Sequence, residues 1–134
     1  MNPWLISYGT ALLAIAVLDG IWLGLIARDL YVREMGELMA TEVRKLPAVL
    51  FYLGYPAGLV TLALQPRPGE PVALGEAALR GALVGLMAYG AYDLTNLAIV
   101  RGWSVKLALV DMAWGTCISA VAATLAAWVL LKRG

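Results

Sequence analysis

The sequence predicts an all-α polytopic membrane protein with four transmembrane helices and one amphipathic interfacial helix. Of its 134 residues, 62% are hydrophobic and 14% are charged, whereas soluble domains have about 45 to 50% apolar and about 25% charged residues. Four long apolar runs occupy most of the chain. None of them shows the strict alternation of a barrel strand, and lipid offers no partner for free backbone amides, so each run is expected to be a helix.

The four runs form a single membrane domain, residues 1–134. They predict spans over four ranges: about 4–27, 47–64, 77–100 and 105–131. No basic n-region or small-residue cleavage pattern accompanies the first run, so we expect a retained span and not a signal peptide. The second run opens at Pro47, a residue favoured in the first turn of a helix. The last run is long enough to tilt in the bilayer.

An interfacial helix is predicted at about 29–45, between the first two spans. The stretch from Arg28 to Lys45 contains four basic and four acidic residues. Its apolar residues recur at helical spacing: Tyr31, Met35, Leu38, Met39 and Val43. This pattern is typical of an amphipathic helix that lies in the membrane interface.

The distribution of lysine and arginine indicates the orientation. On one side of the predicted spans there are Arg28, Arg33, Arg44, Lys45, Arg101 and Lys106. On the other side there are Arg67, Arg80, Lys132 and Arg133. Because cytoplasmic loops carry the excess of positive charge, the first side is predicted to be cytoplasmic and both termini to lie outside.

Composition excludes several classes of function. A net charge of +1 offers no basic face for a nucleic acid. One cysteine cannot build a disulfide framework or a thiolate cluster within the chain. The chain has no histidine, which removes the commonest metal ligand, the usual haem ligand and the easiest proton shuttle.

Three aspartates interrupt the apolar runs: Asp19, Asp93 and Asp111. A charged group at the bilayer centre costs roughly 2.5 to 3.5 kcal/mol even on lenient scales, so such residues usually serve a function. With four alternating spans, one aspartate lies late in the first, one late in the third and one early in the fourth. All three are therefore expected in the same half of the membrane, where they would share a polar pocket.

Aromatic residues accompany two of these aspartates in the same pattern. Asp19 and Trp22, and again Asp111 and Trp114, are three residues apart. This offset places each tryptophan on a neighbouring side of the helical turn, where its indole would shield the carboxylate from lipid. We include both tryptophans in the predicted ligand-binding pocket.

The third span contains the most polar stretch found within any of the four. Tyr89, Asp93 and Asn96 recur at helical spacing, and Tyr92 and Thr95 flank them. Hydroxyl and amide groups from these residues would satisfy the aspartate oxygens and lower the cost of burial. Alternatively, the stretch simply reaches the headgroup region.

Carboxylates in one pocket allow more than one chemistry. Aspartate oxygens suit hard cations such as Mg²⁺, Ca²⁺ or Mn²⁺, and without such an ion they can carry protons or hold a cationic ligand. We assign no metal, no cofactor and no catalytic residue from the sequence. A hard cation bound by the aspartates stays an alternative.

Small residues four positions apart occur in three spans. The pairs are Gly20 and Gly24, Gly54 and Gly58, and Gly81 and Gly85. Such pairs let helices approach closely, so we expect them to pack the four spans together. They also suit a homo-oligomer, since four short helices enclose little volume.

A set of motifs resembles a known family. They are Asp19-Gly20-Ile21-Trp22, Phe51-Tyr52-Leu53-Gly54-Tyr55, Tyr92-Asp93-Leu94-Thr95-Asn96, Gly102-Trp103 and Asp111-Met112-Ala113-Trp114-Gly115-Thr116. Together they are similar to the bacterial four-span membrane proteins of the DUF2177 family, a domain of unknown function, over nearly the whole chain. The resemblance implies a multi-pass protein of the bacterial inner (plasma) membrane and supplies no activity.

These observations lead to three hypotheses of function. The preferred one is a binding or transport module whose carboxylate pocket takes a proton, a small cation or an amphiphile with a basic head. A membrane-embedded enzyme, or its accessory subunit, acting on a lipid or isoprenoid is the second, because buried acids and aromatic faces suit carbocation chemistry. The third is an assembly scaffold. Predicted partners are the lipid bilayer, a lipid or cationic ligand and further copies of the chain.

Overall fold

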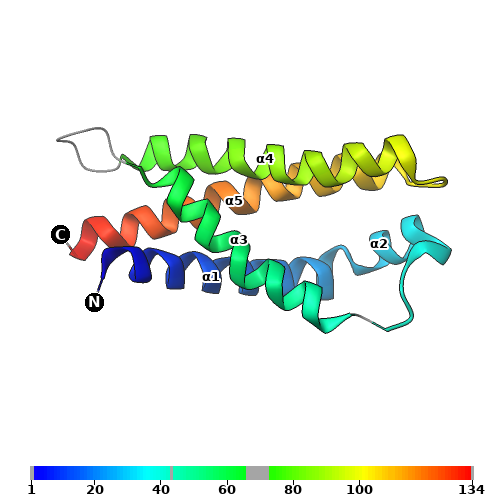
Figure 1. Cartoon of the computed structure of the whole chain (residues 1–134), viewed down its shortest axis with the longest axis horizontal. Helices are drawn as coiled ribbons and strands as arrows, with labels where there is room; N and C mark the ends of the chain where they lie inside the picture. The colour runs from blue at the N-terminus through cyan, green and yellow to red at the C-terminus, as the bar shows by residue number, and fades with distance from the viewer. Residues whose placement is uncertain (1, 43, 66–72, 134) are drawn as a thin grey trace.

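The chain folds into a bundle of long helices. The computed structural model describes residues 2–42, 44–65 and 73–133, which contain helices and no strand. Within these residues, four helices are long and apolar enough to cross a membrane: Pro3–Ile26, Lys45–Ala63, Leu74–Ile99 and Val105–Arg133. Both termini lie at one end of the bundle (Figure 1). The prediction of an all-α polytopic membrane protein is confirmed. Each of these helices begins and ends within three residues of a predicted span.

The first span begins as α1 (Pro3–Ile21). Asn2 caps it by accepting a hydrogen bond from the amide of Trp4, and Pro3 occupies the first turn, where it sacrifices no hydrogen bond. The span continues as a π-helical turn, Trp22–Ile26, in which the amide of Ala27 donates to the carbonyl oxygen of Trp22 at 2.7 Å. Such wide turns are rare and often mark functional sites. This one begins three residues after Asp19.

The interfacial helix is shorter than predicted. Helix α2 runs over Arg28–Met35, and a single 3₁₀ turn, Gly36–Leu38, follows it. Gly36 has a φ of 54°, a backbone conformation that ends an α-helix and that glycine adopts without steric cost. The apolar spacing seen in the sequence continues across this glycine, which explains the overestimate. Val43, which also belonged to the predicted helix, lies outside the described residues.

The second span is α3 (Lys45–Ala63), which crosses the other helices obliquely (Figure 1). Three hydrogen bonds join it to α1: the Trp4 indole donates to the Thr61 hydroxyl at 3.1 Å, the Tyr8 hydroxyl donates to the carbonyl oxygen of Leu53 at 2.7 Å, and the Tyr52 hydroxyl donates to the Asp19 carboxylate. Residues 66–72, which include Arg67, lie outside the described residues. The hydrogen bonds between α1 and α3 therefore run from the end that carries the termini to Asp19.

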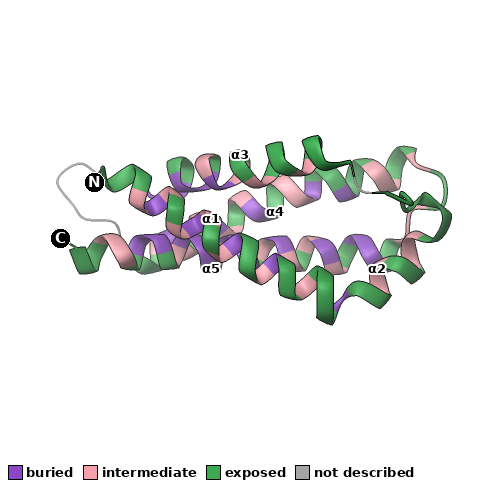
Figure 2. Cartoon of the chain, turned by 90° about the horizontal axis from the view of Figure 1, so that it is seen from below, coloured by how far each residue is buried: buried purple, intermediate pink, exposed green. Residues whose placement is uncertain are grey.

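The closest packing is between α4 (Leu74–Ile99) and α5 (Val105–Arg133). A Cβ atom at Gly81 would lie 2.7 Å from the carbonyl oxygen of Ser119, and one at Gly85 would lie 2.6 Å from the Ser119 hydroxyl. The buried surface of α5 continues with four alanines, Ala122, Ala123, Ala126 and Ala127. Small side chains therefore let the two backbones meet, and buried residues line the inner faces of the bundle (Figure 2).

The other glycine pairs do not pack the bundle. At Gly20, Gly24, Gly54 and Gly58, an added Cβ would have no described atom within 4 Å. The expectation that these pairs bring the four spans together is therefore wrong, because they face away from the neighbouring helices. Only the pair on α4 has this role.

Candidate functional site

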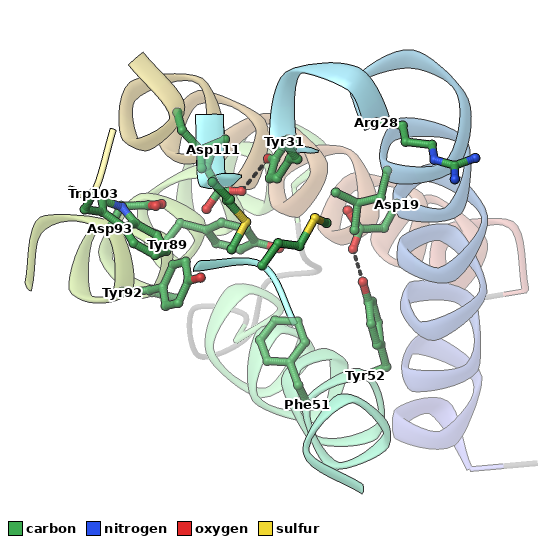
Figure 3. Close-up of a pocket in the computed structure, with 15 residues that line it drawn as sticks. Asp19, Arg28, Tyr31, Phe51, Tyr52, Tyr89, Tyr92, Asp93, Trp103 and Asp111 are labelled. Atoms are coloured by element: carbon green, nitrogen blue, oxygen red, sulfur yellow. Dashed lines mark hydrogen bonds between the residues drawn. The ribbon is translucent and has the colours of Figure 1, made fainter. Parts of the chain in front are cut away.

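A cavity of about 600 Å³ lies inside the bundle, toward the end that carries α2. Its polar lining consists of Asp19, Arg28, Tyr31, Tyr52, Tyr89, Tyr92, Asp93, Trp103 and Asp111. The rest of the lining is Leu23, Met35, Met39, Phe51, Ala88 and Leu107. Every span and α2 contribute to it, so the cavity exists only in the assembled bundle (Figure 3).

The three aspartates from three different spans share this cavity. Asp19 is 6% exposed, Asp93 is fully buried and Asp111 is 9% exposed. Successive spans run in opposite directions, so the late part of α1, the late part of α4 and the early part of α5 lie at the same end. The structure thus brings together the carboxylates that the sequence singles out.

Asp19 is held by two donors from other helices. The indole nitrogen of Trp114 donates to its Oδ1 at 2.8 Å, and the hydroxyl of Tyr52 donates to its Oδ2 (Figure 3). An indole nitrogen can only donate, so it matches a carboxylate oxygen that accepts. Both oxygens of Asp19 therefore already have partners.

Asp111 is held through α2. The hydroxyl of Tyr31 donates to its Oδ1 at 2.6 Å and accepts a hydrogen bond from the indole of Trp22 at 3.2 Å. Burial raises the pKa of Tyr31 above its ordinary value, and the hydrogen bond to the Asp111 carboxylate raises this pKa further. Tyr31 is therefore kept as a neutral donor.

The two aspartate and tryptophan motifs exchange partners. The rings of Trp22 and Trp114 stack with centroids 4.5 Å apart and planes inclined by 8°. Because α1 and α5 are antiparallel, each tryptophan lies level with the aspartate of the other motif. Trp114 binds Asp19 directly, and Trp22 reaches Asp111 through Tyr31. Neither tryptophan lines the cavity. Both therefore position the carboxylates from the side that faces away from the cavity.

Asp93 differs from the other two aspartates. The side chain is fully buried, and neither of its oxygens accepts a hydrogen bond of good geometry from a described residue, but Asp111 and the Trp103 indole lie close enough to interact with it. The indole nitrogen of Trp103 is also buried without a hydrogen bond in the described part of the chain. Both side chains line the cavity and lie beside one another (Figure 3).

Of the polar residues predicted around Asp93, Tyr89 and Tyr92 line the cavity. Thr95 and Asn96 do not: the exposed Thr95 donates to the carbonyl oxygen of Ala91 within its own helix. Thr95 is two residues beyond Asp93, so helix geometry turns it to the far side. Asn96 is half-buried and lies one turn beyond the lining residues.

Several lining residues were not predicted from the sequence. Tyr31, Met35 and Met39 come from α2 and the turn after it, Tyr52 and Phe51 from α3, and Trp103 from the turn between α4 and α5. The apolar spacing of the first three was visible but was assigned to lipid contact. No local pattern marked the other three as facing the aspartates.

A second contact holds α2 over the cavity. The hydroxyl of Ser104 donates to Oε1 of Glu34 at 2.6 Å and also accepts the amide of Leu107 at 3.0 Å, which caps α5. Together with the Tyr31–Asp111 hydrogen bond, this fixes α2 to the α4–α5 end of the bundle. The cavity is therefore covered on this side by α2.

The arrangement does not match a metal centre. Among the described residues, no three acidic, cysteine or histidine side chains come close enough to share a metal ion. Two of the three carboxylates are engaged by neutral donors. The cavity instead combines acidic side chains with aromatic rings and methionine side chains.

Four membrane-crossing helices around an acidic, aromatic cavity define a multi-pass integral membrane protein. The chain belongs to the family described as "Predicted membrane protein (DUF2177)", whose model matches residues 4–128. This match confirms the family resemblance. The comparisons found no matching curated protein and no matching solved structure.

Proposed function

We propose that the protein binds an amphiphile with a basic head group in this cavity. The observation that carries the proposal is the Asp93 carboxylate, which is fully buried among the residues that line the cavity and accepts no hydrogen bond of good geometry from a described residue. A buried charge without a partner is costly. A cationic ligand that donates hydrogen bonds would supply the partner.

The size of the cavity favours an organic ligand over a bare ion. A volume of about 600 Å³ lies within the range of about 300 to 1,000 Å³ that is typical of small-molecule sites. A proton or a single metal ion would leave most of this space empty. Such sites combine largely apolar walls with a few polar groups, and most of the surface that this cavity exposes is likewise apolar, because its tyrosine and tryptophan side chains contribute ring atoms as well as polar ones.

The charge of the cavity favours a cation. Three carboxylates and one guanidinium group, that of Arg28, line it. No lysine or arginine forms an ion pair with these aspartates within the residues that the structure describes. The faces of Phe51, Tyr89 and Tyr92 suit a cation as well, because aromatic rings attract positive charge. The side chains of Met35, in α2, and Met39, after the 3₁₀ turn, can adapt to a ligand's apolar part.

Transport of such a ligand would require more than one copy of the chain. Four helices do not easily enclose an alternating-access pathway, which is usually built from repeated units. The outward-facing Gly54 and Gly58 suit a close helix contact with another copy. We therefore propose a homo-oligomer for transport, whereas binding needs only the cavity of one chain.

The test measures binding of dodecylamine to the protein in nanodiscs, with empty nanodiscs subtracted and dodecanoate as the anionic ligand of equal chain length. We expect dodecylamine to bind and dodecanoate not to bind. Replacing this buried acid (Asp93→Asn) should weaken dodecylamine binding by about tenfold or more, since a hydrogen bond to a charged group contributes about 1.5 to 3 kcal/mol. The exposed acid Asp29 offers a matched control, Asp29→Asn, which should bind as the wild type does.

Two outcomes would contradict the proposal: equal binding of the amine and the carboxylate, or unchanged binding by Asp93→Asn. Mass spectrometry of the recovered ligand separates binding from turnover. A chemically altered ligand would favour the enzyme hypothesis instead.

A further inference from the structure

A groove on the outer surface of the bundle, between α1 and α3, adjoins the cavity. The groove has a volume of about 430 Å³ and is lined by Ala16, Asp19, Gly20, Leu23, Gly24 and Tyr52. Three of these residues, Asp19, Leu23 and Tyr52, also line the cavity. The groove and the cavity therefore meet where the Tyr52 hydroxyl donates to the Asp19 carboxylate (Figure 3).

Two features keep the groove open. A Cβ atom at Gly20 or Gly24 would have no described atom within 4 Å, so the surface of α1 is hollowed at these two positions. The two helices also separate here: among the described residues, the hydrogen bonds between α1 and α3 begin at Tyr52 and continue only toward the termini. The part of α3 before Tyr52 is largely exposed.

Inside the bundle, the cavity is closed toward the end that carries the termini. The hydroxyls of Tyr55 and Ser119 form a hydrogen bond of 2.6 Å between α3 and α5. At and beyond this level, Ile15, Leu59 and Ile118 are at most 1% exposed and belong to one hydrophobic core. A long hydrocarbon chain therefore cannot continue from the cavity along the axis of the bundle, whereas the groove leads it sideways into lipid.

The groove also has the direction that a lipid chain takes in a bilayer. Gly24 lies near the α2 end of the first span, and Ala16 lies near its middle. The helix rises roughly 12 Å between them at ~1.5 Å per residue. An amphiphile in a membrane keeps its head near the interface and its chain toward the centre. Apart from Asp19 and Tyr52 at the junction, the groove is lined by apolar residues and glycine.

We propose that the groove binds the hydrocarbon chain of an amphiphile whose basic head lies in the cavity, so that the ligand enters from the bilayer between α1 and α3. This inference rests on the proposed function and adds the position of the chain and the route of entry. The chain of the bound ligand is the occupant, in preference to bulk lipid or a second copy of the protein, because the groove is continuous with the cavity.

The test locates the chain by photo-crosslinking on the wild-type protein in nanodiscs. The probe is dodecylamine that carries a diazirine near the far end of its chain, and mass spectrometry of the digested protein maps the label. We expect the label on α1, at Ala16 or Gly20. Excess dodecylamine should remove this label, whereas excess dodecanoate should leave it in place.

Gly20→Leu would fill the groove with a side chain that favours a helix more than glycine does. It should remove the label from α1 and weaken dodecylamine binding by about tenfold, because overfilling an occupied site is unfavourable. Gly9→Leu is the matched control on the same helix, since Gly9 also has no described atom near an added Cβ and lines neither the groove nor the cavity. This variant should be labelled and should bind as the wild type does.

The outcomes separate this inference from the proposal on which it rests. If dodecylamine displaces label only from cavity residues such as Ala88 or Leu107, the inference is overturned and the proposed function stands. Label on α1 that is not displaced, beside displaced label in the cavity, would mean that bulk lipid fills the groove and would also overturn it.

An unlabelled α1, together with an oligomer that Gly20→Leu dissociates, would assign the groove to a second copy and overturn the inference as well. If dodecylamine displaces no label anywhere, both the inference and the proposed function fall. The mapping uses the wild type, so a variant that fails to fold would not prevent the test.

Discussion

Tyr31 links the two aspartate and tryptophan motifs through one hydroxyl group. It accepts from Trp22 and donates to Asp111, so the residue works only while its hydroxyl stays protonated. Burial and the Asp111 carboxylate raise the pKa of Tyr31, which favours the protonated form. The pairing of Asp111 is thus protected against alkaline conditions that would ionise an exposed tyrosine.

We predict that Tyr31 stays neutral in the folded protein at pH values where a free tyrosine, with a pKa of about 10, ionises. Because the folded-state pKa is raised, the stability that this hydroxyl contributes is fully present below a pH of about 10 and is lost as the pH rises through the folded-state pKa. The measurement is the tyrosinate absorbance of wild type minus Tyr31→Phe during an alkaline titration.

The folded proteins should show no difference up to about one pH unit above the ordinary pKa of about 10, whereas the unfolded proteins should differ by one tyrosinate. A difference that appears in the folded state near the ordinary pKa would contradict the prediction.

At the scale of helices, α4 and α5 form the most closely packed pair, and their contact also places site residues. Gly115 on α5 lies against the ring of Tyr89, and a Cβ there would overlap this ring. The Tyr89 ring in turn lines the cavity. Close packing between α4 and α5 therefore determines the position of Tyr89 in the cavity relative to Asp111.

Gly85→Ala should lower the free energy of unfolding by about 1 to 3 kcal/mol, because the new methyl group would meet the Gly115 backbone and the Ser119 side chain. Gly9→Ala is the matched control within the first span, since no described atom lies within 4 Å of its added methyl group. The control should be neutral or slightly stabilising. Denaturant titration in detergent measures both, and equal losses would contradict the assigned packing.

Helix α2 shows how a segment outside the spans becomes part of the site. Its polar contacts, Tyr31 to Asp111 and Glu34 to Ser104, hold it across the end of the bundle. Its methionine Met35 then lines the cavity. The amphipathic pattern of α2 accounts for its exposed charged residues. Its position over the end of the bundle is explained by the two hydrogen bonds.

For the molecule as a whole, the even number of spans among the described residues places the two termini on one side and α2 on the other. The excess of lysine and arginine near α2 leads us to propose that this side is cytoplasmic. The site would then lie in the cytoplasmic half of the membrane.

Cysteine accessibility tests this topology. In a background that removes the exposed native thiol by Cys117→Ala, the variants Arg33→Cys and Lys132→Cys should react with an impermeant maleimide from opposite sides of the membrane. In intact cells only Lys132→Cys should be labelled. Labelling of both variants from one side would contradict the four-span topology, and reversed labelling would contradict the orientation alone.

The sequence alone was sufficient for the four spans and for the presence of Asp19, Asp93 and Asp111 at one end. Hydropathy is a property of consecutive residues, and the alternation of direction follows from counting spans. The sequence also predicted that Tyr89 and Tyr92 would lie with Asp93. The same prediction failed for Thr95, because a side chain two residues further along a helix points in nearly the opposite direction.

Only the tertiary structure decided which donor meets which carboxylate. The distance and rotation between helices, which no local pattern encodes, place Trp114 against Asp19 and bring Tyr31 and Tyr52 from elsewhere in the chain. The same geometry leaves Asp93 and Trp103 without a hydrogen bond of good geometry among the described residues. Hydrophobicity thus determined that this chain enters a bilayer and where its acids lie along the spans, whereas helix packing determined which of those acids receive well-formed hydrogen bonds.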